Sequence, residues 1–330
     1  MAGVVKADAY GLGAARVGPA LRDAGCRHFF VAHLAEGVAL REALGPEPTI
    51  AVLNGFAPGA DEDAALLPVL NGLPDVGAHA AAARRRGRAA PAILHLDTGI
   101  SRLGLDAREQ EAVAADPSRL GGLDLRWLMT HLACADEPGH PLNAAQAERF
   151  AAICARLPAG IPRSVANSSG MFLGPAFASD LARPGCALYG INPTPGRPNP
   201  MRQVVRLDAP VLQVREIAPG DTVGYGATWT ATRPSRVATV AAGYADGYLR
   251  ALSGRAFGVF AGQSVPLIGR VSMDLIAFDV TDAPPIAPGA AICLIGPENT
   301  PDDVAARAGT IGYEILTSLG NRYRREHRTT

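Results

Sequence analysis

A single lysine stands at the end of the first apolar run of the chain. Lys6 follows this short run, which is typical of a buried strand, and precedes a loop with Tyr10 and two glycines. The sequence holds 31 lysine and arginine residues, and all of them except Lys6 are arginines. Arginine keeps its proton at working pH, whereas an amine can lose its proton when its pKa is lowered. Lys6 is therefore the one position where this sequence uses a cation that can also act as a nucleophile.

Two interpretations of Lys6 follow from its type and position. A deprotonated amine can attack a carbonyl carbon and form a Schiff base. Beside a glycine loop of phosphate size, this chemistry predicts an aldehyde cofactor such as pyridoxal phosphate (PLP). Alternatively, Lys6 is a strand-end lysine that extends its amine to water. On this residue alone both interpretations stay open.

The composition is that of an ordinary soluble globular protein. A chain of 330 residues can form one to three domains with a large core. Hydrophobic residues make up 48% and charged residues 19% of the sequence. The net charge of +0 offers no electrostatic attraction for nucleic acid or an anionic membrane, so we expect neither partner. The run Arg84–Arg86 with Arg88 is predicted to be a solvated helix face.

Cysteine usage and hydropathy indicate the cellular compartment in which the protein works. The five cysteines are odd in number, widely spaced and free of a C-x-x-C pair. This pattern argues against a disulfide framework and against a zinc site, and it favours a reducing compartment. No apolar run is long enough to span a bilayer, and no signal peptide precedes the first predicted strand. We therefore expect no metal, no membrane association and a cytoplasmic location.

The first two-thirds of the chain alternates short apolar runs with segments of helical period. The clearest helical segments are residues 35–42 and Asn143–Leu157, the latter with Asn143 as a plausible N-cap. The predicted strands are Gly3–Val5, Phe29–Ala32, Ile50–Leu53, Val76–Ala78, Ile93–Leu96, Leu125–Thr130, Ser164–Ala166 and Ala187–Gly190. Eight parallel strands with intervening helices predict an α/β fold, a TIM-type (β/α)₈ barrel over residues 1–203.

A barrel of this kind carries its chemistry at the carboxyl ends of the strands. Several reactive or polar residues lie at or just beyond predicted strand ends: Lys6, Asp97, His131, Asn167 and Ser168. This agreement supports the cofactor interpretation of Lys6.

The remaining residues, 204–330, are predicted to form a mostly β C-terminal domain. One predicted helix, Asp302–Ala308, interrupts short β-type runs between Gly/Pro turns, and Pro193–Pro200 is a stiff connector or loop ahead of them. The runs are Val211–Val214, Val237–Ala241, Phe257–Phe260, Val265–Ile268, Leu275–Val280 and Ala291–Leu294.

Taken together, nine motifs resemble the alanine racemase family of PLP-dependent enzymes, which combine a barrel with a β domain. Each motif is weak alone, but nine in the same order make a specific match. They are V-V-K-A-D-A-Y-G, D-T-G-I-S-R-L-G, T-H-L-A-C-A-D-E, A-N-S-S, R-P-G-C-A-L-Y-G, V-G-Y-G-A-T-W, G-Y-A-D-G-Y, G-R-V-S-M-D and I-G-Y-E-I. The resemblance implies an isomerase that interconverts L-alanine and D-alanine and supplies D-alanine for peptidoglycan.

The resemblance assigns two bases. Lys6 would hold the cofactor as a Schiff base and handle the α-proton of D-alanine, and Tyr225 would handle the proton of L-alanine. Racemisation removes a proton from one face of a carbon and returns one to the other, so two bases on opposite faces suit it. Tyr225 needs nearby cations to act as a base, and without the family match it could be a core or turn tyrosine. In the family this tyrosine comes from the partner subunit, which implies a head-to-tail homodimer.

The cofactor ring would be held by an arginine and a histidine. Arg183 would donate to the pyridine nitrogen and keep it unprotonated, which weakens the ring as an electron sink and suppresses side reactions. His131 would hold Arg183 in place, although a lone histidine at a strand end is more often structural. The phosphate would be bound by Tyr10, Ser168, Tyr313 and the backbone N–H groups of Gly185 and Cys186.

The substrate carboxylate would be held by Arg102, which would also reach the phenolic oxygen of the cofactor. Met273 of the partner subunit would add a backbone donor there, and Asp274 would support the site more weakly. Tyr244 would form a wall of the access route, or simply a turn.

The sequence departs from the family at two places. His95 stands where the family often has a carbamylated lysine that neutralises and orients the arginine matching Arg102. His95 could donate or accept a hydrogen bond, or an anion such as chloride could sit nearby. The resemblance also implies a strand and a helix before the lysine strand, whereas Met1 here lies at the edge of that strand. Without them we expect exposed apolar surface and lower stability.

Four alternatives remain beside an alanine racemase. They are a racemase of broader specificity, for instance on serine; a decarboxylase on the related PLP barrel; a PLP-carrier protein; and an inactive, truncated PLP-binding relative. The decarboxylases lack the tyrosine motif around Tyr225, and the carrier proteins lack a β domain like residues 204–330. Both observations favour the racemase.

Overall fold

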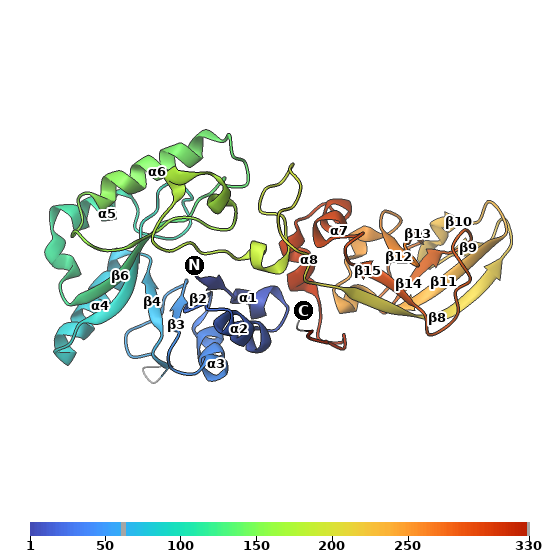
Figure 1. Cartoon of the computed structure of the whole chain (residues 1–330), viewed down its shortest axis with the longest axis horizontal. Helices are drawn as coiled ribbons and strands as arrows, with labels where there is room; N and C mark the ends of the chain where they lie inside the picture. The colour runs from blue at the N-terminus through green and yellow to red at the C-terminus, as the bar shows by residue number, and fades with distance from the viewer. Residues whose placement is uncertain (61–63, 329–330) are drawn as a thin grey trace. The chain divides into compact units, whose positions relative to one another are not determined.

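The computed structural model describes residues 1–60 and 64–328. The chain divides into two compact units (Figure 1). Unit 1 comprises Met1–Leu188 with Asn192–Pro200, and unit 2 comprises Tyr189–Ile191 with Met201–Thr330. Among the described residues, no helix has the length and apolar character needed to cross a bilayer.

Unit 1 is built on one parallel sheet of seven strands whose spatial order is their order in the chain. Its strands are β1 Gly3–Val4, β2 His28–Val31, β3 Thr49–Val52, β4 Leu67–Leu70, β5 Ala90–His95, β6 Leu123–Met129 and β7 Arg163–Ser164. Sequential parallel strands need a crossover between each pair, and here helices supply most of the crossovers. Within β2, β3 and β4 nearly every residue is apolar and buried, because both faces of the sheet are covered there.

An irregular segment, residues 181–184, links the last strand of this sheet to the first. The N–H of Ala2 donates to the carbonyl of Ala182 at 2.8 Å, on the β1 side. The N–H of Leu181 donates to the carbonyl of Arg163 at 3.1 Å, on the β7 side. Backbone hydrogen bonds therefore run from β7 through this segment to β1.

The helices of unit 1 begin and end at residues that suit those positions. α5 begins after the N-cap Asp106, whose carboxylate accepts from the N–H of Glu109 at 2.8 Å. α4 ends at Gly87, whose φ of 63° is the left-handed conformation that favours glycine. The arginines at the end of α4 are exposed, as the sequence predicted. The helices are α1 Lys6–Tyr10, α2 Ala14–Asp23, α3 Leu34–Leu44, α4 Leu73–Arg86, α5 Ala107–Ala115 and α6 Pro141–Cys154.

Three predictions for unit 1 were wrong. Residues 76–78 lie in α4, and the strand is β4 instead, whose Pro68 disguised it in the sequence. Residues 187–190 fall on a 3₁₀ helix, Cys186–Tyr189, because the preceding 181–184 segment takes the place beside β1. The N-cap of α6 is His140, whose Nδ1 accepts from the N–H of Leu142 at 3.2 Å.

Unit 2 is a closed antiparallel barrel of six strands in the order β11-β14-β13-β12-β15-β8. Its interior is a continuous apolar core that includes Val240, Phe278 and Leu294. The predicted β runs and the predicted helix are confirmed, and a second short helix, α8 Gly312–Ser318, was missed. The elements are β8 Leu207–Ile217, β9 Thr222–Val223, β10 Trp229–Thr230, β11 Ser235–Ala241, β12 Phe257–Phe260, β13 Gln263–Ile268, β14 Leu275–Asp279, β15 Ala291–Ile295, α7 Pro301–Ala308 and α8.

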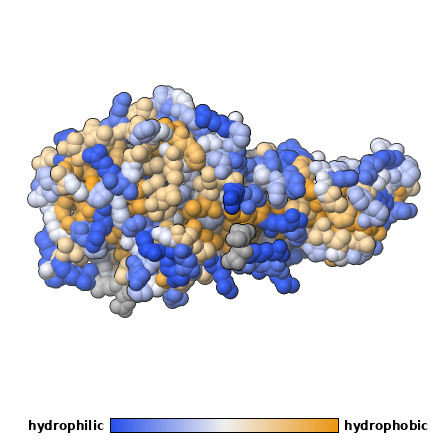
Figure 2. All heavy atoms as spheres, in the orientation of Figure 1, coloured by the Kyte–Doolittle hydropathy of each residue, from blue (hydrophilic) through white to orange (hydrophobic). Residues whose placement is uncertain are grey.

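Large apolar and aromatic side chains are exposed on unit 2. Tyr225 is 75% exposed and Met273 is 53% exposed in the isolated chain. Ile311 and Tyr244 are exposed as well. Figure 2 shows apolar and polar residues side by side over the visible face of each unit.

Candidate active site

The turn that follows β1 has an unusual left-handed backbone. Residues 7–10 have φ values between 52° and 55°, and none of them is glycine. Each such residue costs about 1–3 kcal/mol and persists only where the surroundings fix it. Lys6 directly precedes these residues and is the first residue of the segment labelled α1, so its amine lies at the start of a strained piece of backbone.

The strained turn is held by hydrogen bonds at both ends. The N–H of Ala7 donates to Oε1 of Glu36 at 2.6 Å, and the N–H of Ala14 donates to the carboxylate of Asp8 at 2.7 Å. The other oxygen of Glu36 accepts from the N–H groups of Ala32 and His33 at 2.7 and 3.0 Å. One carboxylate therefore ties the lysine turn to the start of α3.

The surroundings of Lys6 favour its neutral amine. Burial lowers the pKa of Lys6, and the positive charge of Arg102 lowers it further, while Glu36 opposes both. A lowered pKa increases the fraction of neutral amine, which is the nucleophilic form.

Arg183 is buried among neutral oxygens instead of carboxylates. Its guanidinium donates to the carbonyl of Thr130 and to the hydroxyl of Ser164, each at 2.6 Å. Burial lowers the pKa of Arg183 to about 10, so the guanidinium keeps its charge at neutral pH. Among the described residues, no carboxylate forms an ion pair with this guanidinium, so the site holds a cation whose charge is not neutralised.

His131 contacts Arg183 as a neutral acceptor. Nη2 of Arg183 lies 3.4 Å from Nδ1 of His131. A guanidinium only donates, so Nδ1 accepts and the ring proton is assigned to Nε2. Burial, then the charges of Arg183 and Arg102, lower the pKa of His131 to about 3. The structure thus brings Lys6, Arg102, His131 and Arg183 into one electrostatic cluster.

A second group of predicted residues meets at the 181–184 segment and the residues after it. The hydroxyl of Ser168 accepts from the N–H of Gly185 at 2.8 Å and from that of Ala187 at 3.3 Å. A Cβ at Gly185 would overlap the hydroxyl of Tyr10, so only glycine permits this approach. Cys186 follows and is buried. Four of the five predicted phosphate ligands therefore lie together in unit 1.

The other predicted site residues lie in unit 2. Tyr225 lies on a short 3₁₀ turn, Tyr225–Ala227, and a Cβ at Gly226 would lie 3.1 Å from the guanidinium carbon of Arg270. Arg270, which sequence reasoning did not name, therefore lies beside the residue that follows Tyr225. The carbonyl of Met273 accepts from the N–H of Ala245 at 3.0 Å, which fixes the Met273 loop against the turn after Tyr244. Tyr313 lies on α8.

Two family models cover nearly the whole chain. The N-terminal domain of alanine racemase matches residues 1–193, and the C-terminal domain of alanine racemase matches residues 204–327. The chain belongs to the alanine racemase family.

Individual alanine racemases are similar over nearly the full length. The alanine racemase of Acidiphilium cryptum is 58% identical, with 98% of this chain and 91% of the relative covered. That of Rhodospirillum rubrum is 54% identical, with 99% and 88% covered. The crystal structure of alanine racemase from Bartonella henselae with covalently bound pyridoxal phosphate matches with a TM-score of 0.94 at 41% identity, covering 98% of this chain and 91% of that chain.

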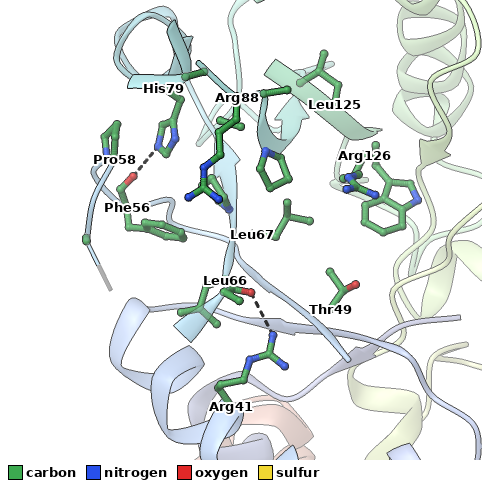
Figure 3. A pocket seen from close by; sticks show the side chains of 18 of the residues that line it. Arg41, Thr49, Phe56, Pro58, Leu66, Leu67, His79, Arg88, Leu125 and Arg126 are labelled. Carbon is green, nitrogen blue, oxygen red and sulfur yellow. Dashed lines mark hydrogen bonds between the residues drawn. The ribbon is translucent and has the colours of Figure 1, made fainter. Parts of the chain in front are cut away.

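Figure 3 shows a large cavity in unit 1 that is not the candidate active site. It has a volume of about 750 Å³ and lies at the amino ends of strands in unit 1, beside Thr49, Leu67 and Leu125 (Figure 3). None of the predicted site residues lines it. In parallel barrels the amino ends of the strands serve stability and the carboxyl ends carry chemistry.

Glu36 and Asn71 are two further residues that sequence reasoning missed. Glu36 stands three residues after His33, the residue that precedes α3, and this capping-box spacing was the available signal. Asn71 follows β4, a strand that was itself missed, so no signal placed it at a strand end.

Proposed function

We propose that this protein is an alanine racemase that interconverts L-alanine and D-alanine with PLP. The observation that carries the proposal is the placement of its only lysine. Lys6 has a lowered pKa beside Arg102 and lies on the strained turn whose Tyr10 packs against Gly185. Relatives at 58% and 54% identity bear this name, and a similar structure holds PLP covalently.

The residues present fit an anionic aldehyde cofactor. Lys6 offers an amine whose lowered pKa favours the neutral form, the Ser168–Gly185–Tyr10 group offers hydroxyls near a backbone amide, and Arg183 offers a charged donor. Bound PLP supplies a carbonyl that condenses with amines and a ring that withdraws electrons from the amino acid. By the family resemblance, the phosphate would be held by Ser168, Tyr10, Gly185, Cys186 and Tyr313, and Arg183 would donate to the ring nitrogen.

The residues of this chain exchange the substrate protons and orient the substrate and Arg183. Lys6 exchanges the proton on one face of the substrate carbon, and Tyr225 of the partner subunit exchanges the proton on the other. Arg102, together with the backbone at Met273 of the partner subunit, orients the substrate carboxylate. His131 stays neutral and accepts from Arg183, so it fixes that guanidinium without removing its charge.

We further propose that unit 1 is a (β/α)₈ barrel and that residues 204–330 form the C-terminal domain. Seven parallel strands in sequential order support this, because the irregular 181–184 segment bonds to both β7 and β1 where an eighth strand would lie. The chain boundary of the barrel is placed at residue 203, within the connection between the two family matches.

The exposure of Tyr225 and Met273 supports a homodimer that lends both residues to the partner subunit. The test mixes two inactive variants, Lys6→Ala and Tyr225→Phe, and refolds them together. One site of each mixed dimer would contain both Lys6 and Tyr225, so about a quarter of the wild-type sites should return. No recovered racemase activity would contradict the shared site.

The activity itself is tested by following the optical rotation of L-alanine and D-alanine separately in the presence of PLP. Borohydride reduction should attach the cofactor to the wild-type chain and not to Lys6→Ala, as measured by mass. We also propose a cytoplasmic enzyme that supplies D-alanine for peptidoglycan. Its gene should then restore growth of a bacterium that requires D-alanine, whereas the Lys6→Ala gene should not.

A further inference from the structure

Asn71 fixes which nitrogen of His95 carries a proton. Nδ2 of Asn71 donates to the carbonyls of Leu53 and Val69 at 2.9 and 3.2 Å. These two bonds orient the amide so that its oxygen faces Nδ1 of His95 at 2.8 Å. An amide oxygen only accepts, so the hydrogen-bond network assigns the proton of His95 to Nδ1.

The other nitrogen of His95 is a buried lone pair without a partner. Burial, then the positive charges of Arg183 and, less strongly, Arg102 lower the pKa of His95 to about 4, with Asp97 opposing them. At neutral pH the ring therefore has one proton, and Nε2 can only accept. Nε2 is fully enclosed and has no hydrogen-bond partner among the described residues. A buried acceptor of this kind normally receives a hydrogen bond, so we expect a donor to reach Nε2.

The loop that carries Arg102 is anchored to His95. It leaves β5 after His95 and returns where the N–H of Leu105 donates to the carbonyl of His95 at 2.8 Å. Gly104 has a φ of +104°, and a Cβ there would lie 3.1 Å from Cγ of the imidazole. The loop thus packs directly on the ring, which keeps Arg102 within the electrostatic reach of His95.

Neighbouring groups do not supply the missing contact. The carboxylate of Asp97 accepts from the N–H groups of residues 99–101 at 2.9–3.2 Å, so it stabilises the loop itself. Arg183 already donates to Thr130, Ser164 and Val165 and contacts His131. Within the described part of the chain, Arg102 forms no hydrogen bond or ion pair, so its donors remain available.

We propose that His95 is a positioning residue for Arg102, whose guanidinium donates to Nε2 of His95 when substrate is bound. The inference rests on the proposed racemase function. The proposal also argues against a chloride ion bound to His95, because an anion needs a donor and Nε2 presents a lone pair. A neutral acceptor orients Arg102 without cancelling its charge, which leaves that charge for the substrate carboxylate.

The kinetic test compares His95→Leu with His95→Gln in the PLP-loaded enzyme. Leucine fills the space without an acceptor, whereas the glutamine oxygen can take the place of Nε2. We expect the KM for alanine to rise about tenfold in His95→Leu and less than about threefold in His95→Gln, the size of a hydrogen bond to a charged group. Circular dichroism and urea unfolding verify that both variants fold. Equal KM values in the leucine variant and the wild type would overturn the proposal.

A chloride series separates the two explanations for Arg102. Sodium chloride is replaced by sodium gluconate at constant ionic strength, and KM is measured again. We expect no change in the wild type. A KM that rises as chloride is withdrawn would overturn the proposal in favour of a bound anion.

Nuclear magnetic resonance tests the tautomer independently of activity, so it separates failure of this inference from failure of the proposed function. In ¹⁵N-histidine-labelled holoenzyme, the signals lost in His95→Gln should show a protonated Nδ1 and an unprotonated Nε2 between about pH 6 and 8. Propionate, a carboxylate without an amine, should shift the Nε2 signal in the wild type but not in Arg102→Met. A proton on Nε2, or the same shift in both proteins, would overturn the proposal.

Discussion

The carboxylate of Glu36 accepts a hydrogen bond from the backbone N–H of Ala7 at 2.6 Å, across 29 positions of sequence. Ala7 is the first left-handed residue after Lys6, and the second oxygen of Glu36 is bonded to the backbone before α3. The only lysine of the protein is therefore oriented by a residue on a different element.

Glu36→Gln should weaken the lysine turn. The amide can present only one acceptor oxygen, so either Ala7 or the Ala32–His33 pair loses its partner, at a cost of about 1–3 kcal/mol. We expect slower borohydride-trapped attachment of PLP to Lys6 and a lower free energy of unfolding in urea. Glu42→Gln, an exposed change on the same helix, is the control. Equal trapping rates in both variants would show that Glu36 does not position Lys6.

Gly185→Ala should lower the affinity for PLP, because its Cβ would overlap the hydroxyl of Tyr10. The variant should lose about fivefold to 100-fold in PLP affinity, measured by fluorescence titration of the apoprotein, since an overpacked contact typically costs about 1–3 kcal/mol. Adding Tyr10→Phe removes the overlapping oxygen and should recover part of this loss relative to Tyr10→Phe alone. If the two substitutions are simply additive, the contact between these residues is not the cause.

Arg183→Met should destabilise unit 1. The methionine leaves the carbonyl of Thr130 and the hydroxyl of Ser164 without their donor, and each orphaned group costs about 1–3 kcal/mol. Arg183→Lys should lower the free energy of unfolding by less, because the ammonium keeps the charge and can still donate to one oxygen. It should remain below the wild type, because an ammonium cannot reach both oxygens as a planar guanidinium does. Urea unfolding measures both variants. Arg108→Met, on the exposed surface of α5, should change the free energy of unfolding by less than about 0.5 kcal/mol.

Acid should destabilise the fold through His95 and His131. Their pKa values in the folded protein, about 4 and about 3, lie below the ordinary value of 6.5, so the unfolded chain binds protons first as the pH falls. The stabilisation is complete above about pH 6.5 and is lost toward pH 4, at up to about 1.4 kcal/mol per pH unit for each histidine. His95→Gln should flatten the dependence of the urea midpoint between about pH 6.5 and 5. The exposed His327→Gln should leave that slope unchanged, and an equally steep slope in His95→Gln would refute the assignment.

Local sequence preferences did not predict the backbone of the lysine turn or the position of the 181–184 segment. The left-handed φ values of residues 7–10 contradict the preferences of alanine and tyrosine. Contacts with Glu36 and with the backbone of neighbouring turns support them. Residues 181–184 lack the apolar alternation of a strand, yet they take a place beside β1 because hydrogen bonds from both neighbours hold them there.

The sequence alone determined the identity of the chemistry and the class of each unit. A single lysine among arginines, polar residues at strand ends and nine ordered motifs were sufficient, because residue type and spacing carry that information. The tertiary structure decided the protonation and orientation of the site. Whether Nε2 of His95 donates or accepts depends on Asn71, which lies 24 positions away in sequence. It also depends on the burial of His95 and on the nearby charges of Arg183 and Arg102. Such long-range contacts and desolvation arise only when the strands are assembled side by side.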